Sequence, residues 1–286
     1  MSKTTIVSII TPFYNAKLWL GKVVAVTQAQ NLQDFEHLLV DDSSTDGGAD
    51  DLRRMCENDS RYRILTMAVN GGPSAARNLA LSVARGQYIA FLDADDTWLP
   101  EKLEQQVQWM KQTGHAFSFH DYRFMSHDGR LVGDVVSGPD LLTFRTLHTQ
   151  RGVGCLSVMI DSWQVKEFRF SEMRQRAMPE DFVAWLSIIQ AGHLGHRMPQ
   201  DLGRYRVSNN SRSANKMNAS KGLWLILRDI EKFHLFRAIS YWICYAWGAF
   251  KLHRRARPKY SDPHLTIPRL CRKDPAPLDR AQRHSL

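Results

Sequence analysis

The sequence has 286 residues, of which 43% are hydrophobic and 23% are charged, and its formal net charge is +9 at pH 7. These proportions are those of an ordinary globular protein, with room for one large domain and an appendage. The four cysteines form no CxxC pair, which argues against a disulfide framework or a zinc site, and no zinc-finger or RNA-binding signature accompanies the positive charge, so we expect no nucleic-acid partner.

The first hundred residues alternate between strand and helix patterns. Apolar runs predict strands at 5–13, 35–42, 62–68 and 87–93, and amphipathic runs predict helices at 18–30, 47–59 and 72–86. Strands joined through helices indicate an α/β fold with a mostly parallel sheet and helices on both faces. Ligands bind outside the carboxyl ends of the strands in such sheets, so the polar loops after these strands should converge on one cleft.

The second half of the sequence continues with mixed elements. A helix is predicted at 101–114 and a strand at 115–125, and the turn at Asp128 and Gly129 predicts a hairpin after that strand. A further strand is expected at 154–161, a helix at 178–193, and loop and strand over 195–216.

The last part of the chain is helical in pattern, aromatic and basic. Its apolar run from Leu235 to Phe250 is shorter than the roughly 20 residues of a membrane-spanning helix, so we expect it to lie in a membrane interface. The expected anchors of this last part are Trp224, Trp242, Tyr245, Trp247 and Phe250. The alternative is that its aromatic side chains pack on the main domain. We therefore expect a main domain over residues 1–221, an amphipathic segment over 222–257, and a disordered tail over 258–286.

Three acids follow the buried strand at 87–93. Like charges this close repel one another, and hard carboxylate oxygens suit Mg²⁺ or Mn²⁺, so Asp93, Asp95 and Asp96 indicate a divalent cation bound with substrate phosphates. An alternative reading makes Asp95 and Asp96 the acidic N-terminus of the next helix. That alternative does not account for Asp93, which ends the strand.

Two other strand ends carry candidate binding residues. Asp41 and Asp42 end the second strand, where a carboxylate is able to accept from a base or a ribose, although the Ser and Thr residues that follow also suit a helix cap. Gly71 and Gly72 allow close approach of the backbone to a ligand, and Arg77 follows in the first turns of a helix, where it is placed to meet a phosphate. An ordinary amphipathic helix after a turn is the alternative there.

Glu180 and Asp181 precede an apolar helix face. A carboxylate in this place is able to act as a general base on a hydroxyl group. The alternative is a helix start with favourable acids.

Taken together, these segments resemble a known family. "VSIITPFYNA", "LLVDDSSTDGG", "GGPSAARNLAL", "GQYIAFLDADDTWLPEKLEQQ" and "PEDFVAWLSI" follow, in order and spacing, the pattern of family 2 glycosyltransferases over roughly residues 5 to 225. "GCLSVMID" and "YRVSNNSRSANKMNASKGLW" resemble the branch that builds bacterial surface polysaccharides, including the teichuronic acid, O-antigen and exopolysaccharide glycosyltransferases.

The resemblance implies a GT-A fold and assigns roles to residues. Asp181 matches the catalytic base, with Glu180 beside it, and Asp42 the contact to uracil. Asp95 is implied as the metal ligand, with Asp93 at the metal or the ribose; the metal would be Mn²⁺ or Mg²⁺. The residues implied to bind the donor are Thr11, Pro12, Tyr14, Asn15, Asp42, Gly72, Arg77, Asp93 and Ala94.

The resemblance also implies an activity. We expect an inverting transfer of a sugar from a nucleotide sugar, a UDP-hexose, to a polyprenyl-diphosphate-linked saccharide, by an enzyme held peripherally on an anionic membrane surface at the cytoplasmic face. The N-terminus lacks the length and cleavage site of a signal peptide. The alternatives are a non-catalytic nucleotide-sugar or glycan-binding module and a sugar nucleotidyltransferase.

Overall fold

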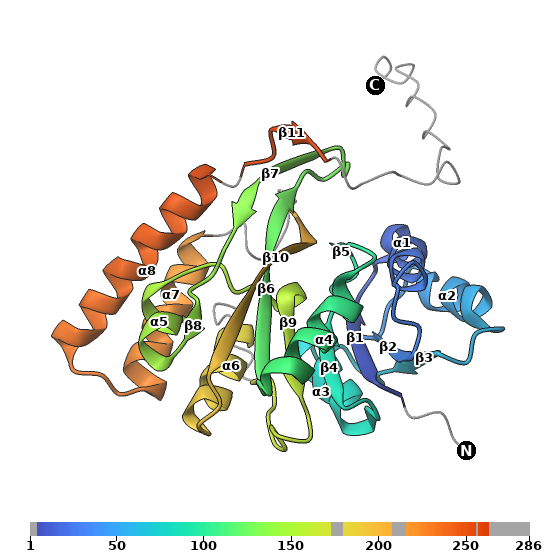
Figure 1. Cartoon of the computed structure of the whole chain (residues 1–286), viewed down its shortest axis with the longest axis horizontal. Coiled ribbons are helices and arrows are strands. Elements are labelled where there is room, and N and C mark those ends of the chain that lie inside the picture. Colours follow the sequence, from blue (N-terminus) through green and yellow to red (C-terminus); the bar gives the residue numbers. More distant parts are fainter. Residues whose placement is uncertain (1–4, 173–179, 208–215, 256, 263–286) are drawn as a thin grey trace, which may run out of the picture.

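A computed structural model describes residues 5–172, 180–207, 216–255 and 257–262 of the chain (Figure 1). The first half contains β1 (Val7–Phe13), α1 (Lys17–Gln28), β2 (Phe35–Asp41), α2 (Gly48–Cys56), β3 (Tyr62–Thr66), α3 (Pro73–Val83) and β4 (Tyr88–Phe91). β1 pairs in parallel with β2 and β4, and β2 pairs in parallel with β3. The alternating pattern of the first hundred residues is therefore confirmed.

The second half contains β5 (Thr97–Trp98), α4 (Lys102–Thr113), β6 (Phe117–Met125), β7 (Leu131–Val136), β8 (Leu141–Leu142), α5 (Phe144–Thr149), the 3₁₀ turn η1 (Cys155–Ser157), β9 (Val158–Asp161), α6 (Glu180–Gln190) and β10 (Gly195–Arg206). β9 joins β4 to β6, and both of its pairings are antiparallel. β6 and β7 form the predicted hairpin, and β10 runs parallel to β6. The sheet is therefore mixed, and the expectation of a mostly parallel sheet holds only for its first half.

Both faces of the parallel strands are covered, because their side chains alternate between two cores. Ile9 and Leu39 face α1, α2 and α4, whereas Ile10 and Leu38 face α3, α6 and the C-terminal helices. Every residue of β1 and β2 is buried. Burial along the whole strand is typical of strands that are covered on both sides.

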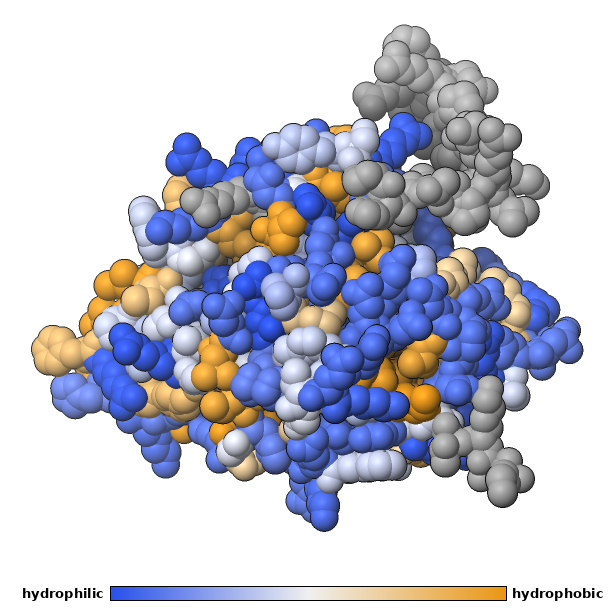
Figure 2. Space-filling view, in the orientation of Figure 1, coloured by the Kyte–Doolittle hydropathy of each residue, from blue (hydrophilic) through white to orange (hydrophobic). Residues whose placement is uncertain are grey.

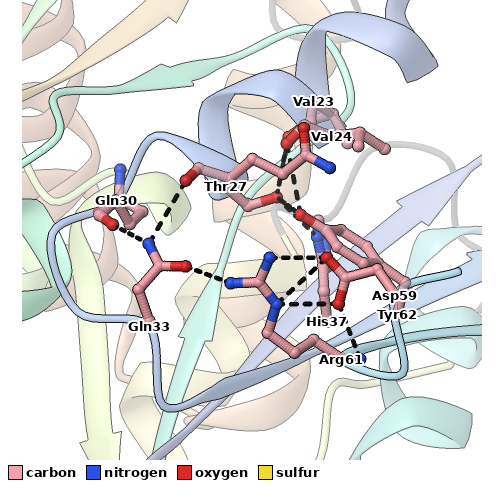
Figure 3. Close-up of polar contacts among 10 residues, drawn as sticks. Val23, Val24, Thr27, Gln30, Gln33, His37, Asp59, Arg61 and Tyr62 are labelled. Atoms are coloured by element: carbon pink, nitrogen blue, oxygen red, sulfur yellow. Dashed lines mark hydrogen bonds and ion pairs between the residues drawn. The ribbon is translucent and has the colours of Figure 1, made fainter.

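A buried polar network links α1 to β2 and β3, beside the core that contains Ile9 and Leu39 (Figure 3). The hydroxyl of Thr27 in α1 lies 2.9 Å from the Tyr62 hydroxyl and 3.3 Å from Nδ1 of His37. Nε2 of His37 lies 2.8 Å from the hydroxyl of Thr11, which donates to the carbonyl of Leu92. Burial lowers the pKa of His37 to about 3, so its imidazole is neutral and able to link β1, β2 and α1 by hydrogen bonds.

The C-terminal elements complete the core of the main domain. They are α7 (Lys216–Leu225), the π turn η3 (Ile226–Ile230), α8 (Leu235–Arg255) and β11 (Tyr260–Ser261). Leu223, Ile226, Leu227 and Ala238 are fully buried in the same core as β4 and α6. The segment that follows residue 221 therefore packs into the core of the main domain.

The predicted start of the tail at residue 258 needs correction. Tyr260 and Ser261 pair with β7, and the carboxylate of Asp262 forms an ion pair with the fully buried Arg204. An extra strand pairing and a buried charge partner hold this stretch to the sheet. The rest of the predicted tail lies outside the described residues. No helix in the described part of the chain is long and apolar enough to cross a bilayer.

Candidate active site

The carboxyl ends of β1, β2 and β4 meet at one edge of the sheet, as predicted (Figure 1). The loop after β1 is tied to the loop after β2, because the backbone N–H of Asn15 donates to Ser44 Oγ and the N–H of Thr45 donates to Asn15 Oδ1. Asn15 and Ser43 both adopt positive φ, at 47° and 62°. The two loops therefore form one tightly turned rim.

Asp42 holds the glycine turn that precedes α3. Its Oδ1 and Oδ2 accept the backbone N–H groups of Gly71 and Gly72 at 2.7 and 2.8 Å. Gly72 has a φ of 84°, which favours glycine, and Pro73 then starts the helix. Asp42 thus lies at the predicted edge, with one hydrogen bond to each carboxylate oxygen and further lone pairs on both.

Arg77 connects α3 to two of the predicted acids. Its Nη2 donates to Asp93 Oδ1 at 2.6 Å, its Nη1 lies 3.4 Å from Glu180 Oε2, and its guanidinium stacks over the Phe170 ring. Burial acts to lower the pKa of Arg77, but the charges of Asp93 and Glu180 raise it above its usual value. The structure thereby brings three predicted residues from distant segments into direct contact.

Asp96 has a structural role that was not predicted from the sequence. Its side chain is 5% exposed and its Oδ1 accepts the backbone N–H of Arg206 at 2.8 Å, which ties the end of β4 to β10. The next two residues form β5 rather than the start of a helix, so the helix N-terminus reading of Asp95 and Asp96 is wrong. Tertiary pairing with β10 decides the conformation of this stretch.

Asp95, like Asp93, is half-buried. Burial, and then the neighbouring charge of Asp93, raise the pKa of Asp95 above its usual value. The side chain of Arg206 donates to the backbone carbonyl of Asp95 at 2.7 Å. A divalent cation would relieve this repulsion, and the hard oxygens of Asp93 and Asp95 are ligands that Mg²⁺ and Mn²⁺ prefer.

In the described residues, no group of three or more His, Cys, Asp or Glu side chains is arranged to hold a metal ion. Mg²⁺ bound with a nucleotide commonly takes one or two protein carboxylates and completes its shell with phosphates and water. Asp93 and Asp95 are suited to that role.

Asp181 lies in the first turn of α6, and its Oδ1 accepts the backbone N–H of Phe182 at 2.8 Å. Burial raises the pKa of Asp181, while the charges of Arg77 and then Arg151 oppose that shift. Glu180 is held by Arg77, as described above. Of the two acids, Asp181 is therefore the one whose carboxylate makes no ion pair with Arg77.

The other predicted donor residues lie at different depths. Tyr14 is 52% exposed and Asn15 is exposed, so both side chains stand on the rim of the strand edge. Pro12 and Ala94 are buried, and Thr11 is fully buried with its hydroxyl bonded inside the core. The side chain of Thr11 thus supports the edge from below, which corrects the expectation that it lines a pocket.

Sequence reasoning did not find Arg151 and Tyr245. The guanidinium carbon of Arg151 lies 3.1 Å from the centre of the Tyr245 ring, and the charge of Arg151 acts on Asp181. A single arginine in a loop has no local pattern, and Tyr245 was read as a surface anchor of an aromatic helix. Only the packing of α8 on α5 brings the two together.

A family model described as Glycosyl transferase family 2 matches residues 8–152. The chain belongs to glycosyl transferase family 2. The match includes Asp42, Arg77, Asp93 and Asp95, whereas Asp181 lies beyond it. Membership makes the chain a transferase and removes the nucleotidyltransferase and non-catalytic alternatives.

Two relatives align over nearly their whole length. TuaG of Bacillus subtilis, named as a teichuronic acid biosynthesis glycosyltransferase, is 37% identical over 86% of this chain and 96% of its own. WfgD of Escherichia coli is 32% identical over 87% of this chain and 95% of its own, and is named a UDP-Glc:alpha-D-GlcNAc-diphosphoundecaprenol beta-1,3-glucosyltransferase.

Solved structures share the fold at low sequence identity. Residues 1–349 of Staphylococcus aureus TarS, solved with UDP-GlcNAc, superimpose with a TM-score of 0.61 at 17% identity, covering 88% of this chain and 74% of that one. A Pyrobaculum calidifontis mannosyltransferase, solved with GDP-Man and Mn²⁺, gives a TM-score of 0.60 at 17% identity, covering 86% of this chain and 70% of that one. These similarities establish the GT-A fold.

Proposed function

We propose that this chain is an inverting hexosyltransferase that moves a sugar from a UDP-hexose to a saccharide carried on a polyprenyl diphosphate, in the biosynthesis of a bacterial surface polysaccharide. The observation that carries the proposal is the convergence of Asp93, Arg77 and the start of α6, with its Glu180 and Asp181, at the carboxyl edge of the sheet. The names of TuaG and WfgD, the second of which states a UDP-glucose donor and a diphosphoundecaprenol acceptor, support the choice of substrates.

The donor would lie along the edge formed by β1, β2 and β4. Tyr14 and Asn15 stand on the rim there, and Asp42 is our candidate for the contact to uracil, because each carboxylate oxygen keeps a lone pair beyond its bond to the glycine turn. Gly72 leaves the backbone open to close approach, since no atom lies within 4 Å of the position of a Cβ. Thr11, Pro12 and Ala94 would shape this pocket from beneath.

Asp93 and Asp95 would hold Mn²⁺ or Mg²⁺. When bound, the ion would stabilise the charge that develops on the departing UDP. Arg77 fixes the carboxylate of Asp93, which restricts its side chain to one geometry.

Asp181 is our candidate for the general base. It would take the proton of the acceptor hydroxyl as that oxygen attacks the anomeric carbon, while the electrons of the bond to UDP pass to the diphosphate. One displacement from the opposite face inverts the configuration. The partial burial of Asp181 raises its pKa, which makes it a stronger base than an exposed aspartate.

We further propose that the enzyme works at the cytoplasmic face of the cell membrane and docks there through α8. One stripe of this helix leaves large apolar side chains exposed: Phe236, Ile239, Ile243, Trp247 and Phe250. Figure 2 displays hydrophobic surface at the end of the molecule where α8 lies in Figure 1. Lys251 and Arg254 follow on the same helix and are exposed, which suits an anionic surface.

The test is a transfer reaction with a mixture of UDP-sugars and a synthetic lipid-diphosphate sugar, analysed by mass spectrometry and NMR. The proposal expects a product one hexose heavier, with the anomeric configuration opposite to that of the donor. Transfer with retained configuration, or no transfer from any UDP-sugar, would contradict it.

A further inference from the structure

Arg151 carries a partly buried charge between α5 and α8. It follows α5, it is half-buried, and its Nε and Nη2 atoms are enclosed without a hydrogen-bond partner. A guanidinium group withdrawn from water without a carboxylate or carbonyl partner is energetically costly. Nε of Arg77 also lacks a partner, but Arg77 and Arg206 both donate hydrogen bonds through other atoms of the guanidinium group, whereas no hydrogen bond of the Arg151 guanidinium is found among the described residues. The residues that the structure describes therefore supply no hydrogen-bond partner for Nε and Nη2 of Arg151.

The ring of Tyr245 fixes the guanidinium in place. The guanidinium carbon lies 3.1 Å from the ring centre, and Tyr245 of α8 is itself only 9% exposed. Three residues further along α8, a Cβ atom at Gly248 would lie 3.2 Å from Cγ of Arg151. The helix thus leaves room for this one side chain and stacks an aromatic ring on it, which orients the planar donor group.

Arg151 stands next to the start of α6. His148, three residues earlier, packs its ring against Phe182, the residue after Asp181, with 5.1 Å between ring centres. His148 also contacts Tyr241 of α8 at 5.3 Å. The charges of Arg151 and Asp181 act on each other, although the two side chains form no ion pair within 4.0 Å.

We propose that Arg151 binds a phosphate oxygen of the acceptor's lipid diphosphate. The inference rests on the proposed function, in which Asp181 contacts the acceptor hydroxyl and the donor diphosphate lies at Asp93 and Asp95. Arg151 comes from the other half of the fold and lies against α8, the helix whose outer face we propose to meet the membrane. A phosphate matches the unused N–H groups of a guanidinium in geometry and charge.

The test compares two acceptors that carry the same sugar: one on a lipid diphosphate and one on an uncharged alkyl chain of equal length. Wild type should prefer the diphosphate acceptor in kcat/KM. Arg151→Gln should raise KM for the diphosphate acceptor by about tenfold or more, as expected for a lost charge-assisted contact, and should leave the uncharged acceptor within about twofold. Arg145→Gln is the matched control, because Arg145 is an exposed arginine on the preceding helix.

The outcomes separate the inference from the function on which it rests. If wild type uses neither acceptor, the proposed function fails. If Arg151→Gln weakens both acceptors equally, or raises the KM of the UDP-sugar instead, then Arg151 serves the base or the donor and the inference is overturned. Circular dichroism and calorimetric UDP affinity report whether the variant folds. If it does not, Arg151→Met keeps the apolar stem of the side chain without the charge, and an unchanged preference for the diphosphate acceptor in that variant overturns the inference as well.

Discussion

Nη2 of Arg77 lies 2.6 Å from Oδ1 of Asp93, and this contact joins α3 to the carboxyl end of β4. Both side chains were predicted at the same edge of the sheet, but nothing in the sequence paired them. The arginine is 7% exposed at its side chain and also faces Glu180, so it neutralises one acid from each half of the fold. Its loss would remove this positive charge from both acids.

We therefore expect Arg77→Met to destabilise the protein. The expected loss in the free energy of unfolding is about 2–3 kcal/mol, because the partners of a removed buried charge stay poorly solvated. Urea unfolding at pH 7 measures it. Arg53→Met, which removes an exposed ion pair with Asp50, is the control and should change stability little. Equal effects of the two substitutions would contradict the role of Arg77.

The neutral buried imidazole of His37 gives a prediction for acid stability. Its folded pKa is about 3 and the unfolded value is about 6.5, so the unfolded state binds a proton that the folded state does not. Its contribution to stability is present above pH 6.5 and is lost as the pH falls toward 3. His37→Gln should reduce the slope of unfolding free energy against pH by about 1.4 kcal/mol per pH unit below pH 6. Urea unfolding between pH 7 and 4.5 measures this, and parallel slopes in the two proteins would disprove it.

Activity should depend on a divalent cation. Asp95→Ala removes a proposed ligand of the ion, so we expect turnover to fall at least about a hundredfold, and EDTA to abolish transfer until Mn²⁺ or Mg²⁺ is restored. Asp128→Ala, an exposed acid in the β6–β7 turn, is the control. Undiminished transfer in excess EDTA would rule out the metal proposal.

The membrane proposal calls for surface substitutions rather than truncation. Removal of the chain after residue 221 would take Leu223, Ile226 and Leu227 out of the core, so a truncated protein would not report on docking alone. The double variant Trp247→Ser and Phe250→Ser changes only exposed rings. It should lower sedimentation with anionic vesicles at low salt while transfer to a water-soluble acceptor is kept.

Salt and a second surface provide the controls for docking. Added salt should weaken vesicle binding of the wild type, because the contribution of the arginine and lysine charges is screened. The double variant Met55→Ser and Trp163→Ser changes exposed apolar residues elsewhere and should bind as wild type does. A wild type that ignores anionic vesicles at low salt would refute the docking proposal.

The sequence predicted the parallel half of the fold because each of its strands is a short apolar run that ends in polar residues. It predicted the antiparallel hairpin of β6 and β7 but missed the antiparallel pairing of β9 with β4 and β6, because that pairing joins segments that are distant in the chain. The role of Asp96 was missed for the same reason, because its partner is a backbone N–H of β10.

The aromatic C-terminal helix shows how one pattern allows two readings. Among the predicted anchors, Tyr245 of α8 is buried, Trp224 of α7 and Trp242 of α8 are half-buried against the core, and Trp247 and Phe250 of α8 are exposed. Aromatic residues at helical spacing suit a core or a membrane face equally well. Packing on α5 and α7 decides which side chain faces which way.

The role of Asp181 is the central claim, and the kinetics of Asp181→Asn test it most directly. This substitution keeps the shape of the side chain, including an oxygen for the Phe182 N–H, but removes its ability to accept a proton. We predict a fall in kcat of about 10² to 10⁴ with the affinity for UDP-sugar unchanged by calorimetry, while Glu180→Gln, whose wild-type carboxylate is held by Arg77, loses less. Near-normal turnover of Asp181→Asn would contradict the account, and a larger loss in Glu180→Gln would transfer the role of the base to Glu180.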